Sequence, residues 1–525
     1  MIQHPRIEQH SLVCAGGHVL NIQVYRSVER VELYSSILVM TPYGAQRYQQ
    51  DGQRFSTAGF AMVVVDSRGC GASSGCFEPF EHDGEDARHV IRWIVTQAWS
   101  NGRVGMYGGS YSGFVQWAAC KEPVGGLKSL APVASVHPGV DFPAVNGLLY
   151  LYASRWLAYV AQRAEDEERY LDNGFWNNRL RAVSASNPAA LIAAAGNQAV
   201  TLRRWLYELG NDKYWQRLLP DLGCMAGLDI PALFITGTHD DDQRGTLGYY
   251  TQLSERQRGK SLLVIGPWDH DGTRQPRACF GGLEHNSASC LDLLELHIQW
   301  YRFTLDGGAR PAICRLPVLY YMAGRECWFE STSFAQLSDR KLTLHCAAAG
   351  GLGYMPVSSK SISMILPGPA PCIGNVMEHE PTYRASSQLL ESAAGVAFTS
   401  AAGQQPLALC GVPSVTLYLR VGRSADVCVR LYALLPDRTA LYLGASNRKV
   451  DRAEGFYAQP WLFDSFNLIC RELPASSQVR AIVSLSDPSL WLSDNDMQTE
   501  VELHYGGDCP CTLSLPLQAL ATRND

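Results

Sequence analysis

The chain has 525 residues, of which 46% are hydrophobic, and its formal net charge at pH 7 is -6. This length exceeds the roughly 250 to 300 residues at which a single core stops growing, so we expect two or three domains. The net charge argues against nucleic acid or an anionic membrane as a partner, and the sequence shows neither a signal peptide nor a membrane span. The composition therefore predicts a globular protein of the cytoplasm.

The cysteine pattern also favours a reducing compartment. The sixteen cysteines are scattered singly, and several, such as Cys346, Cys428 and Cys470, lie within apolar runs. Such positions are typical of buried reduced thiols rather than of a disulfide framework. Cys509 and Cys511 form a close pair, but no second pair or histidine cluster at zinc spacing accompanies them. We therefore expect neither a metal nor a cofactor.

Strand-like and helix-like segments alternate over the first part of the chain. Short, continuous apolar runs, typical of strands buried on both faces, occur at 37–40, 61–65, 104–107, 232–236 and 262–265. Residues 83–94 begin with acids and then place apolar side chains on one stripe, which predicts a helix. This alternation predicts an α/β fold with a mostly parallel sheet covered on both sides.

Two changes of pattern suggest the domain boundaries. Residues 140–225 are rich in Trp, Tyr, Leu, Ala and Arg without a convincing strand, which predicts a helical cap inserted into the α/β domain. After residue 312 the pattern has a period of two, which is typical of an all-β sandwich, with strand-like runs at 342–346, 415–420, 429–434, 479–485 and 500–505. The expected units are therefore an α/β domain (1–139 and 226–311), a cap (140–225) and an all-β domain (312–525).

Ser110 lies in a glycine-rich turn directly after the apolar run 104–107. A serine at the tip of a sharp strand-to-helix turn projects into a cleft, and the turn needs small neighbours, here Gly108, Gly109 and Gly113. The match to the G-x-S-x-G pattern is imperfect, because Ser112 stands where the second glycine would be. Ser110 is therefore a candidate nucleophile, although ordinary strand–helix connections also contain such serines.

A serine hydroxyl needs a base, and His270 follows a buried-strand pattern that ends in Gly-Pro. A surface-loop histidine is the alternative reading. The acid that orients the base should come from another strand end, and the run Asp240, Asp241, Asp242 provides it. We favour Asp240, with Asp241 or Asp242 as alternatives. The order Ser, Asp, His is that of α/β-hydrolases.

Four motifs in this order resemble the cocaine esterase / X-prolyl dipeptidyl-peptidase family of CocE/NonD-type serine hydrolases. They are VDSRGCGASSG from position 65, GGSYSG from 108, GTHD from 237 and GPWDH from 266. The resemblance implies an α/β-hydrolase domain with a helical cap and a C-terminal jelly-roll domain. It also implies a triad of Ser110, Asp240 and His270. The implied oxyanion hole consists of the Tyr111 backbone N–H and the Tyr43 hydroxyl, although a core or surface role is the default for a tyrosine.

The chain also departs from the family pattern. Thr238 and His239 stand where relatives carry Trp and an aromatic residue, which we expect to reshape the acyl pocket. The loop 484–495 retains little of the family's pattern beyond Pro488, Asp494 and Asn495. We interpret Arg68 as an ion-paired loop clamp and the acidic run 165–168 as a solvated helix face.

These observations predict a serine hydrolase that cleaves a small-molecule carboxylic ester or amide through an acyl-enzyme. An acyltransferase or cyclising enzyme of a biosynthetic pathway would use the same residues if the site held an amine or alcohol and excluded water. A hydrolase-fold protein that binds without turnover is a third hypothesis, which the intact triad disfavours. The sequence is also compatible with a homodimer, and it leaves the acyl and leaving groups open.

Overall fold

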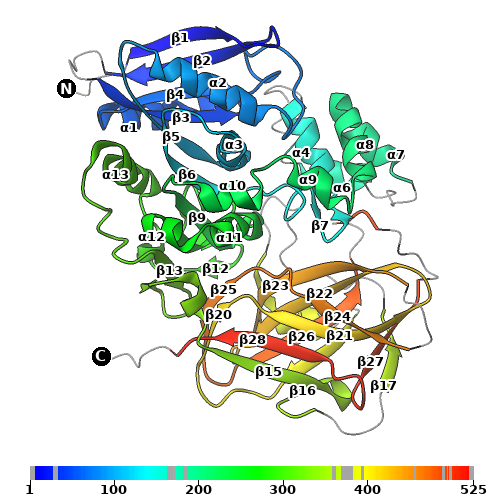
Figure 1. Cartoon of the computed structure of the whole chain (residues 1–525). Helices are drawn as coiled ribbons and strands as arrows, with labels where there is room; N and C mark the ends of the chain where they lie inside the picture. The colour runs from blue at the N-terminus through cyan, green and yellow to red at the C-terminus, as the bar shows by residue number, and fades with distance from the viewer. Residues whose placement is uncertain are drawn as a thin grey trace.

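The chain forms an α/β body and a β body that lie against each other (Figure 1). The α/β body extends to Ser331, and the β body begins at Arg340. The computed structural model describes residues 6–27, 33–161, 170, 172–180, 187–356, 362–367, 382–391, 395–452, 457–486, 491–493, 495 and 499–519.

Within these residues, the first body is built on a ten-stranded sheet. Its strands, in spatial order, are β1 (Arg6–Val13), β2 (Val19–Arg26), β4 (Ala61–Asp66), β3 (Tyr34–Thr41), β5 (Ser100–Ser110), β6 (Leu127–Ser135), β9 (Leu233–His239), β10 (Leu262–Asp269), β13 (Val318–Met322) and β14 (Cys327–Ser331). Pairing is parallel from β4 through β3, β5, β6, β9 and β10 to β13. The predicted parallel sheet is confirmed. The five apolar runs lie within its strands, except that Ala232 comes one residue before the start of β9.

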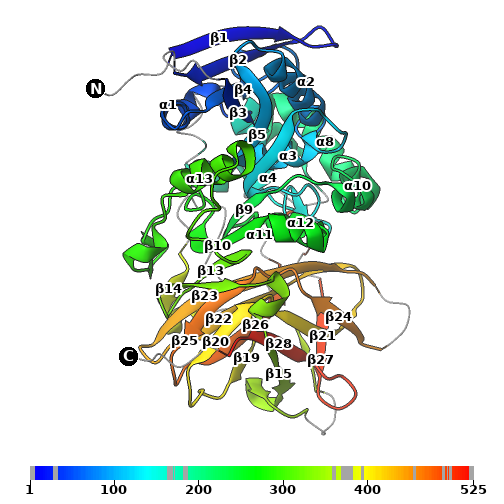
Figure 2. The same cartoon turned by 60° about the vertical axis from the view of Figure 1, so that its left-hand side comes forward.

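Helices cover both faces of this sheet, as Figure 2 shows for α1 and α13 on one side and α2 and α3 on the other. Their bounds are α1 (Gln49–Thr57), α2 (Asp83–Val95), α3 (Tyr111–Ala119), α11 (Gln243–Gln252), α12 (Glu255–Lys260) and α13 (Leu293–Asp306), and a 3-10 turn, η1 (Ala45–Tyr48), precedes α1. Each face has its own apolar cluster. The helix predicted at 83–94 is confirmed, and its stripe of Ala87, Val90, Ile91 and Ile94 is fully buried.

The insertion between β6 and β9 is largely helical, as predicted. It contains α4 (Tyr152–Ala161), α6 (Asn173–Leu180), α7 (Ala189–Ala194), α8 (Ala199–Tyr207), α9 (Asp212–Gln216) and α10 (Leu222–Gly227). A short hairpin of β7 (Ala144–Val145) and β8 (Leu148–Leu149) precedes them, although no strand was expected here. The insertion packs on the sheet domain through aromatic rings: the Trp156 ring stacks against Phe80 and Tyr111 at centroid distances of 6.3 and 5.7 Å. The acidic run 165–168 lies outside the described residues.

The second body is all β, as predicted. In the part of the chain that the structure describes, it consists of a fourteen-stranded sheet. Its strands are β15 (Arg340–Ala347), β16 (Gly351–Gly353), β17 (Ile362–Ile365), β18 (Arg384–Ser386), β19 (Val396–Ser400), β20 (Leu407–Gly411), β21 (Ser414–Val421), β22 (Ala425–Leu434), β23 (Thr439–Val450), β24 (Gln459–Phe463), β25 (Ile469–Leu473), β26 (Gln478–Leu485), β27 (Val501–Tyr505) and β28 (Thr512–Leu517). Buried and partly exposed residues alternate along β21, because one face of the strand lines the apolar core.

The α/β sheet extends beyond residue 311, where we expected the first domain to end. Strand β13 pairs in parallel with β10, and β14 adds antiparallel to β13. The pattern of a strand does not tell which of two sheets it joins, so the sequence placed both strands in the second domain. In the loop 484–495, Asn495 bonds to the backbone of Asp426 on β22 through both ends of its amide, whereas Pro488 and Asp494 lie outside the described residues.

The seam between the two bodies holds the loop after β9. The side chain of Gln243, the first residue of α11, accepts a hydrogen bond from Leu468 N at 2.6 Å and donates to Leu468 O at 3.2 Å. Asn467 donates from Nδ2 to the backbone oxygen of Asp240 at 2.9 Å. The all-β domain therefore fixes the backbone of a predicted site residue in the first domain.

We predict that Gln243→Ala lowers the midpoint of thermal unfolding. Gln243 is fully buried, and its removal leaves the Leu468 backbone groups without partners, at a cost of about 1–3 kcal/mol for each buried group. Differential scanning calorimetry measures the effect. Thr251→Ala, at an exposed position on the same helix, is the matched control and should leave the midpoint unchanged. Equal midpoints for both variants would contradict the bridging role of Gln243.

Candidate active site

Ser110 lies at a strained turn between β5 and α3. Its φ of 58° and ψ of -121° are unusual for a residue other than glycine. The turn needs small neighbours, as predicted: a Cβ on Gly108 would lie 2.6 Å from Ser112 Cβ, and one on Gly113 would lie 2.9 Å from Ser135 Cβ. The imperfect motif also has a structural explanation, because buried Ser112 donates to Met40 O at 2.8 Å. The turn leaves Ser110 itself half-buried.

The structure brings His270 and Asp240 together at the carboxyl ends of β10 and β9. His270 Nδ1 lies 2.8 Å from Asp240 Oδ1. The Asp240 carboxylate is fully buried, and it accepts further hydrogen bonds from Thr236 Oγ1 at 2.8 Å and from Asp242 N at 3.1 Å. The nearest oxygen of Asp242 is 3.7 Å from the same imidazole nitrogen. Geometry therefore favours Asp240 over Asp241 and Asp242.

Tyr43 lies in the loop that follows β3. Its hydroxyl accepts a hydrogen bond from Trp156 Nε1 of the cap at 3.2 Å and lies within hydrogen-bonding reach of the Ser110 side chain. Burial raises the pKa of the Tyr43 phenol, although the bonds with Trp156 and Ser110 act against this. The phenol therefore stays protonated near neutral pH and can donate a hydrogen bond. The sequence analysis did not identify Trp156. The feature that could have indicated it was the high aromatic content of the insertion.

The Tyr111 side chain is buried, and its hydroxyl is hydrogen-bonded to other residues of the first domain. Its hydroxyl donates to Asp83 Oδ2 at 2.6 Å and accepts from Phe80 N at 2.8 Å. Tyr111 is also the first residue of α3, so its backbone N–H lies among those at a helix N-terminus that have no partner within the helix. The backbone group, rather than the phenol, is thus the part of Tyr111 available to an oxyanion beside Ser110.

Opposing charges set the protonation of His270. Burial and the positive charge of Arg274 lower the pKa of the imidazole. The hydrogen bond to Asp240 and the negative charges of Asp242 and Asp240 act more strongly, and they raise this pKa to about 9. The imidazole is therefore mostly protonated at pH 7 and becomes an available base as the pH rises. Arg274 is a further residue of this site that sequence reasoning missed.

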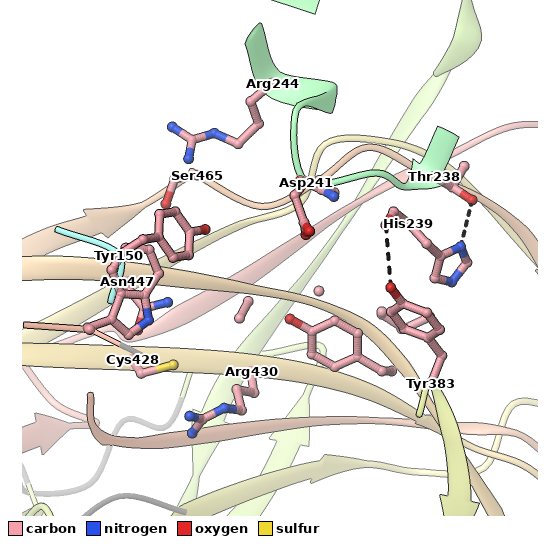
Figure 3. Close-up of a pocket in the computed structure, with 16 residues that line it drawn as sticks. Tyr150, Thr238, His239, Asp241, Arg244, Tyr383, Cys428, Arg430, Asn447 and Ser465 are labelled. Carbon is pink, nitrogen blue, oxygen red and sulfur yellow. Dashed lines mark hydrogen bonds between the residues drawn. The ribbon is translucent and has the colours of Figure 1, made fainter. Parts of the chain in front are cut away.

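Thr238 and His239 line a cavity of about 100 Å³ at the seam between the two bodies (Figure 3). The His239 ring packs edge-on against Tyr383 of the all-β domain, with centroids 4.6 Å apart. Burial lowers the pKa of His239 to about 3, so this imidazole is neutral. The lining of the cavity includes neither Ser110 nor His270. The two departures from the family pattern therefore shape the domain seam.

One group among the described residues has potential metal-ligand geometry, and it consists of Cys14, His18 and Asp86. The Asp86 carboxylate accepts hydrogen bonds from Arg68 Nε at 3.0 Å and Nη2 at 2.6 Å, and His18 Nε2 lies 3.1 Å from Oδ1. Arg68 is thus an ion-paired loop clamp, as predicted. Because the charge of Arg68 already neutralises Asp86, the group of Cys14, His18 and Asp86 is poorly suited to binding a metal cation.

A serine, an aspartate and a histidine at the strand ends of a parallel sheet define the α/β-hydrolase class. A sequence model of the X-Pro dipeptidyl-peptidase (S15 family) matches residues 16–272, and one of the X-Pro dipeptidyl-peptidase C-terminal non-catalytic domain matches residues 320–482. Together they cover most of the chain, which belongs to the X-Pro dipeptidyl-peptidase (S15) family, as the motifs predicted. Among the described residues, no helix combines the length and apolar character needed to cross a bilayer.

Individual relatives match parts of the sequence. The cocaine esterase of Rhodococcus sp. (strain MB1 Bresler) is 31% identical over 235 residues, which are 41% of this chain and 39% of that protein. A putative Xaa-Pro dipeptidyl-peptidase of Bacillus anthracis is 30% identical over 143 residues, 24% of this chain and 23% of that protein. The matches thus span well under half of each relative's length.

Two solved structures superpose on almost the whole chain. An aminopeptidase from the marine sediment archaeon Thaumarchaeota archaeon has a TM-score of 0.84 at 19% identity and covers 99% of this chain and 97% of its own. An alpha-amino acid ester hydrolase has a TM-score of 0.82 at 18% identity, and the match covers 98% of this chain and 97% of that structure's chain. At these identities the likeness establishes the two-domain fold.

We predict that Asp240→Asn slows the labelling of Ser110 by a fluorophosphonate on the order of 10⁴-fold, because an asparagine amide does not hold the imidazole in the required tautomer. In the unsubstituted protein the labelling rate should rise with pH and level off above about 9, where His270 is neutral. Mass spectrometry against time gives the rates. Asp241→Asn is the matched control, and an equal loss in that variant would contradict the assignment of Asp240.

Proposed function

We propose that this protein is a serine hydrolase that cleaves a carboxylic ester or amide through an acyl-enzyme. The observation that carries the proposal is the 2.8 Å contact of His270 with buried Asp240, at the strand ends beside a strained, half-buried Ser110. Its family membership supports the same chemistry. The individual substrate does not follow from the relatives.

In the proposed reaction, His270 Nε2 takes the proton of the Ser110 hydroxyl as its oxygen attacks the carbonyl carbon. The negative charge that develops on the carbonyl oxygen is stabilised by the Tyr43 hydroxyl and the Tyr111 backbone N–H. The imidazolium then gives its proton to the leaving group, and the bond to that group breaks. Water, activated by the same histidine, releases the acid and restores Ser110.

Asp240 keeps the proton of the imidazole on Nδ1, so that Nε2 faces the reaction. It also stabilises the imidazolium that forms. Its own geometry is fixed by Thr236 and by the loop backbone, which is tied in turn to Asn467 of the all-β domain. This arrangement supports a structural contribution of the second domain to the catalytic site.

Acyl transfer to an amine or alcohol would use the same residues and differ in the second nucleophile. Product analysis with and without an added acceptor separates the two reactions. The proposed cytoplasmic location is supported by the thiols, because none of the fifteen cysteines that the structure describes forms a disulfide. Cys410 and Cys470 Sγ lie 3.7 Å apart without a disulfide.

The proposed function is tested by intact-mass analysis after treatment with a fluorophosphonate, together with turnover of para-nitrophenyl acetate. We expect a single label and measurable turnover in the unsubstituted protein, and loss of both in Ser110→Ala. Ser112→Ala is the matched control on the same turn and should still be labelled. A folded protein that is neither labelled nor active would contradict the proposal.

We also predict that Tyr43→Phe lowers kcat for para-nitrophenyl acetate by about 10² to 10³, because it removes one donor to the oxyanion. KM should change much less, since the donor acts mainly on the transition state. Tyr159→Phe is the control: its ring stacks on Tyr43 at 6.1 Å, but its hydroxyl accepts from Arg47. Equal activities of the two variants would argue against Tyr43 as a donor.

A further inference from the structure

Arg274 lies close to Nε2 of His270, the nitrogen that accepts and donates the proton in the proposed reaction. It lies four residues after His270, in the loop that follows β10. Its Nη1 is 3.4 Å from His270 Nε2, while the other imidazole nitrogen is bound to Asp240. Among the hydrogen bonds of the described residues, the one that involves His270 Nε2 is this contact with Arg274.

The same side chain lies across the nucleophile turn. A Cβ on Gly109 would be 3.1 Å from Arg274 Cδ and 3.2 Å from its Nη1. The positive charge of Arg274 also acts on the phenols of Tyr43 and Tyr48. Burial raises the pKa of each phenol, and the charge of Arg274 lowers it. The guanidinium is therefore placed among the nucleophile, the base and the proposed oxyanion donor.

Arg274 is only weakly engaged by the protein. The one carboxylate within 4 Å among the described residues is Asp271, whose Oδ1 accepts from Nη2 at 2.9 Å. That carboxylate is 66% exposed and the Arg274 side chain 37% exposed, so solvent screens the pair. Arg277 in the same loop differs, because it binds the 14% exposed Asp269 at 2.6 Å. Arg277 thus serves the loop, whereas Arg274 keeps donors for another partner.

We infer that Arg274 binds a carboxylate on the leaving group of the substrate, so that the preferred substrates are acyl derivatives of amino or hydroxy acids. This inference rests on the proposed serine hydrolase function. The leaving-group side follows from the contact with Nε2, since that nitrogen delivers the proton to the departing nitrogen or oxygen. A guanidinium presents a planar fork of donors that matches a carboxylate in two parallel hydrogen bonds.

The chemistry of the first step benefits from such an anion. The Ser110 oxygen forms its bond to the carbonyl carbon, its proton moves to His270, and the proton then passes to the leaving group as the old bond breaks. When no anion is bound to it, Arg274 disfavours the imidazolium form of His270, because both groups are positive. A substrate carboxylate on Arg274 neutralises that charge, so the bound substrate makes protonation of His270 easier.

The test compares two esters that differ in one charge. In meta-acetoxybenzoate the leaving phenol carries a carboxylate, and in meta-acetoxybenzamide it carries a neutral amide of nearly the same shape. We expect kcat/KM to favour the carboxylate by about tenfold or more, as a charge-assisted hydrogen bond predicts. Arg274→Gln should bring the ratio close to one, and Arg274→Lys should restore part of it.

Arg277→Gln is the matched control, because it removes the same charge from the same loop and should keep the ratio. A ratio near one in the unsubstituted protein, or an unchanged ratio in Arg274→Gln, would overturn the inference. A second pair, monomethyl succinate and methyl succinamate, places the carboxylate on the acyl group. A preference for the charged member of this pair alone would overturn the assignment to the leaving group.

A binding measurement separates this inference from the proposed function. Calorimetry compares meta-hydroxybenzoate, the leaving group itself, with meta-hydroxybenzamide and requires no turnover. Tighter binding of the carboxylate that is lost in Arg274→Gln supports the anion site even if no ester is cleaved. Equal binding of both compounds in the unsubstituted protein would refute it, whereas loss of fluorophosphonate labelling bears on the hydrolase function alone.

Discussion

The hydrogen bond between Asp240 and His270 is the interaction on which the rest of the site depends. It requires a buried carboxylate that is held in one orientation, and hydrogen bonds from Thr236 and from the loop backbone provide this. The loop itself is tied to the all-β domain through Asn467. The second domain, though distant in sequence, therefore contributes to the orientation of the imidazole.

The nucleophile turn adds a steric constraint to this electrostatic one. The positive φ of Ser110 is tolerated because the turn is closely packed on both sides, against Ser112 and against Ser135 of the neighbouring strand. The cap then covers the turn through Trp156, which positions Tyr43. Strand, cap and loop thus meet at one half-buried hydroxyl, which is where a carbonyl group would have to bind.

The charges around His270 oppose one another. Its carboxylate partners favour the imidazolium, and Arg274 disfavours it. Such a balance leaves the proton affinity of the base sensitive to any further charge brought in by a ligand. Arg274 is exposed and has a weak partner, so a bound substrate can change its environment more than that of the other groups in this site. Recognition of the leaving group by Arg274 is thereby connected with proton transfer at His270.

The sequence by itself determined the parallel sheet, the cap, the all-β domain and the strand-end positions of Ser110 and His270, because apolar runs and glycine-rich turns depend on near neighbours along the chain. It left three aspartates as alternatives, and only the folded loop places Asp240 closest to the imidazole. The tertiary structure also decided that β13 and β14 join the first sheet and that Arg274 lies over the nucleophile turn. The physical reason is that these features arise from contacts between strands, loops and domains, whose geometry no local pattern of residues encodes.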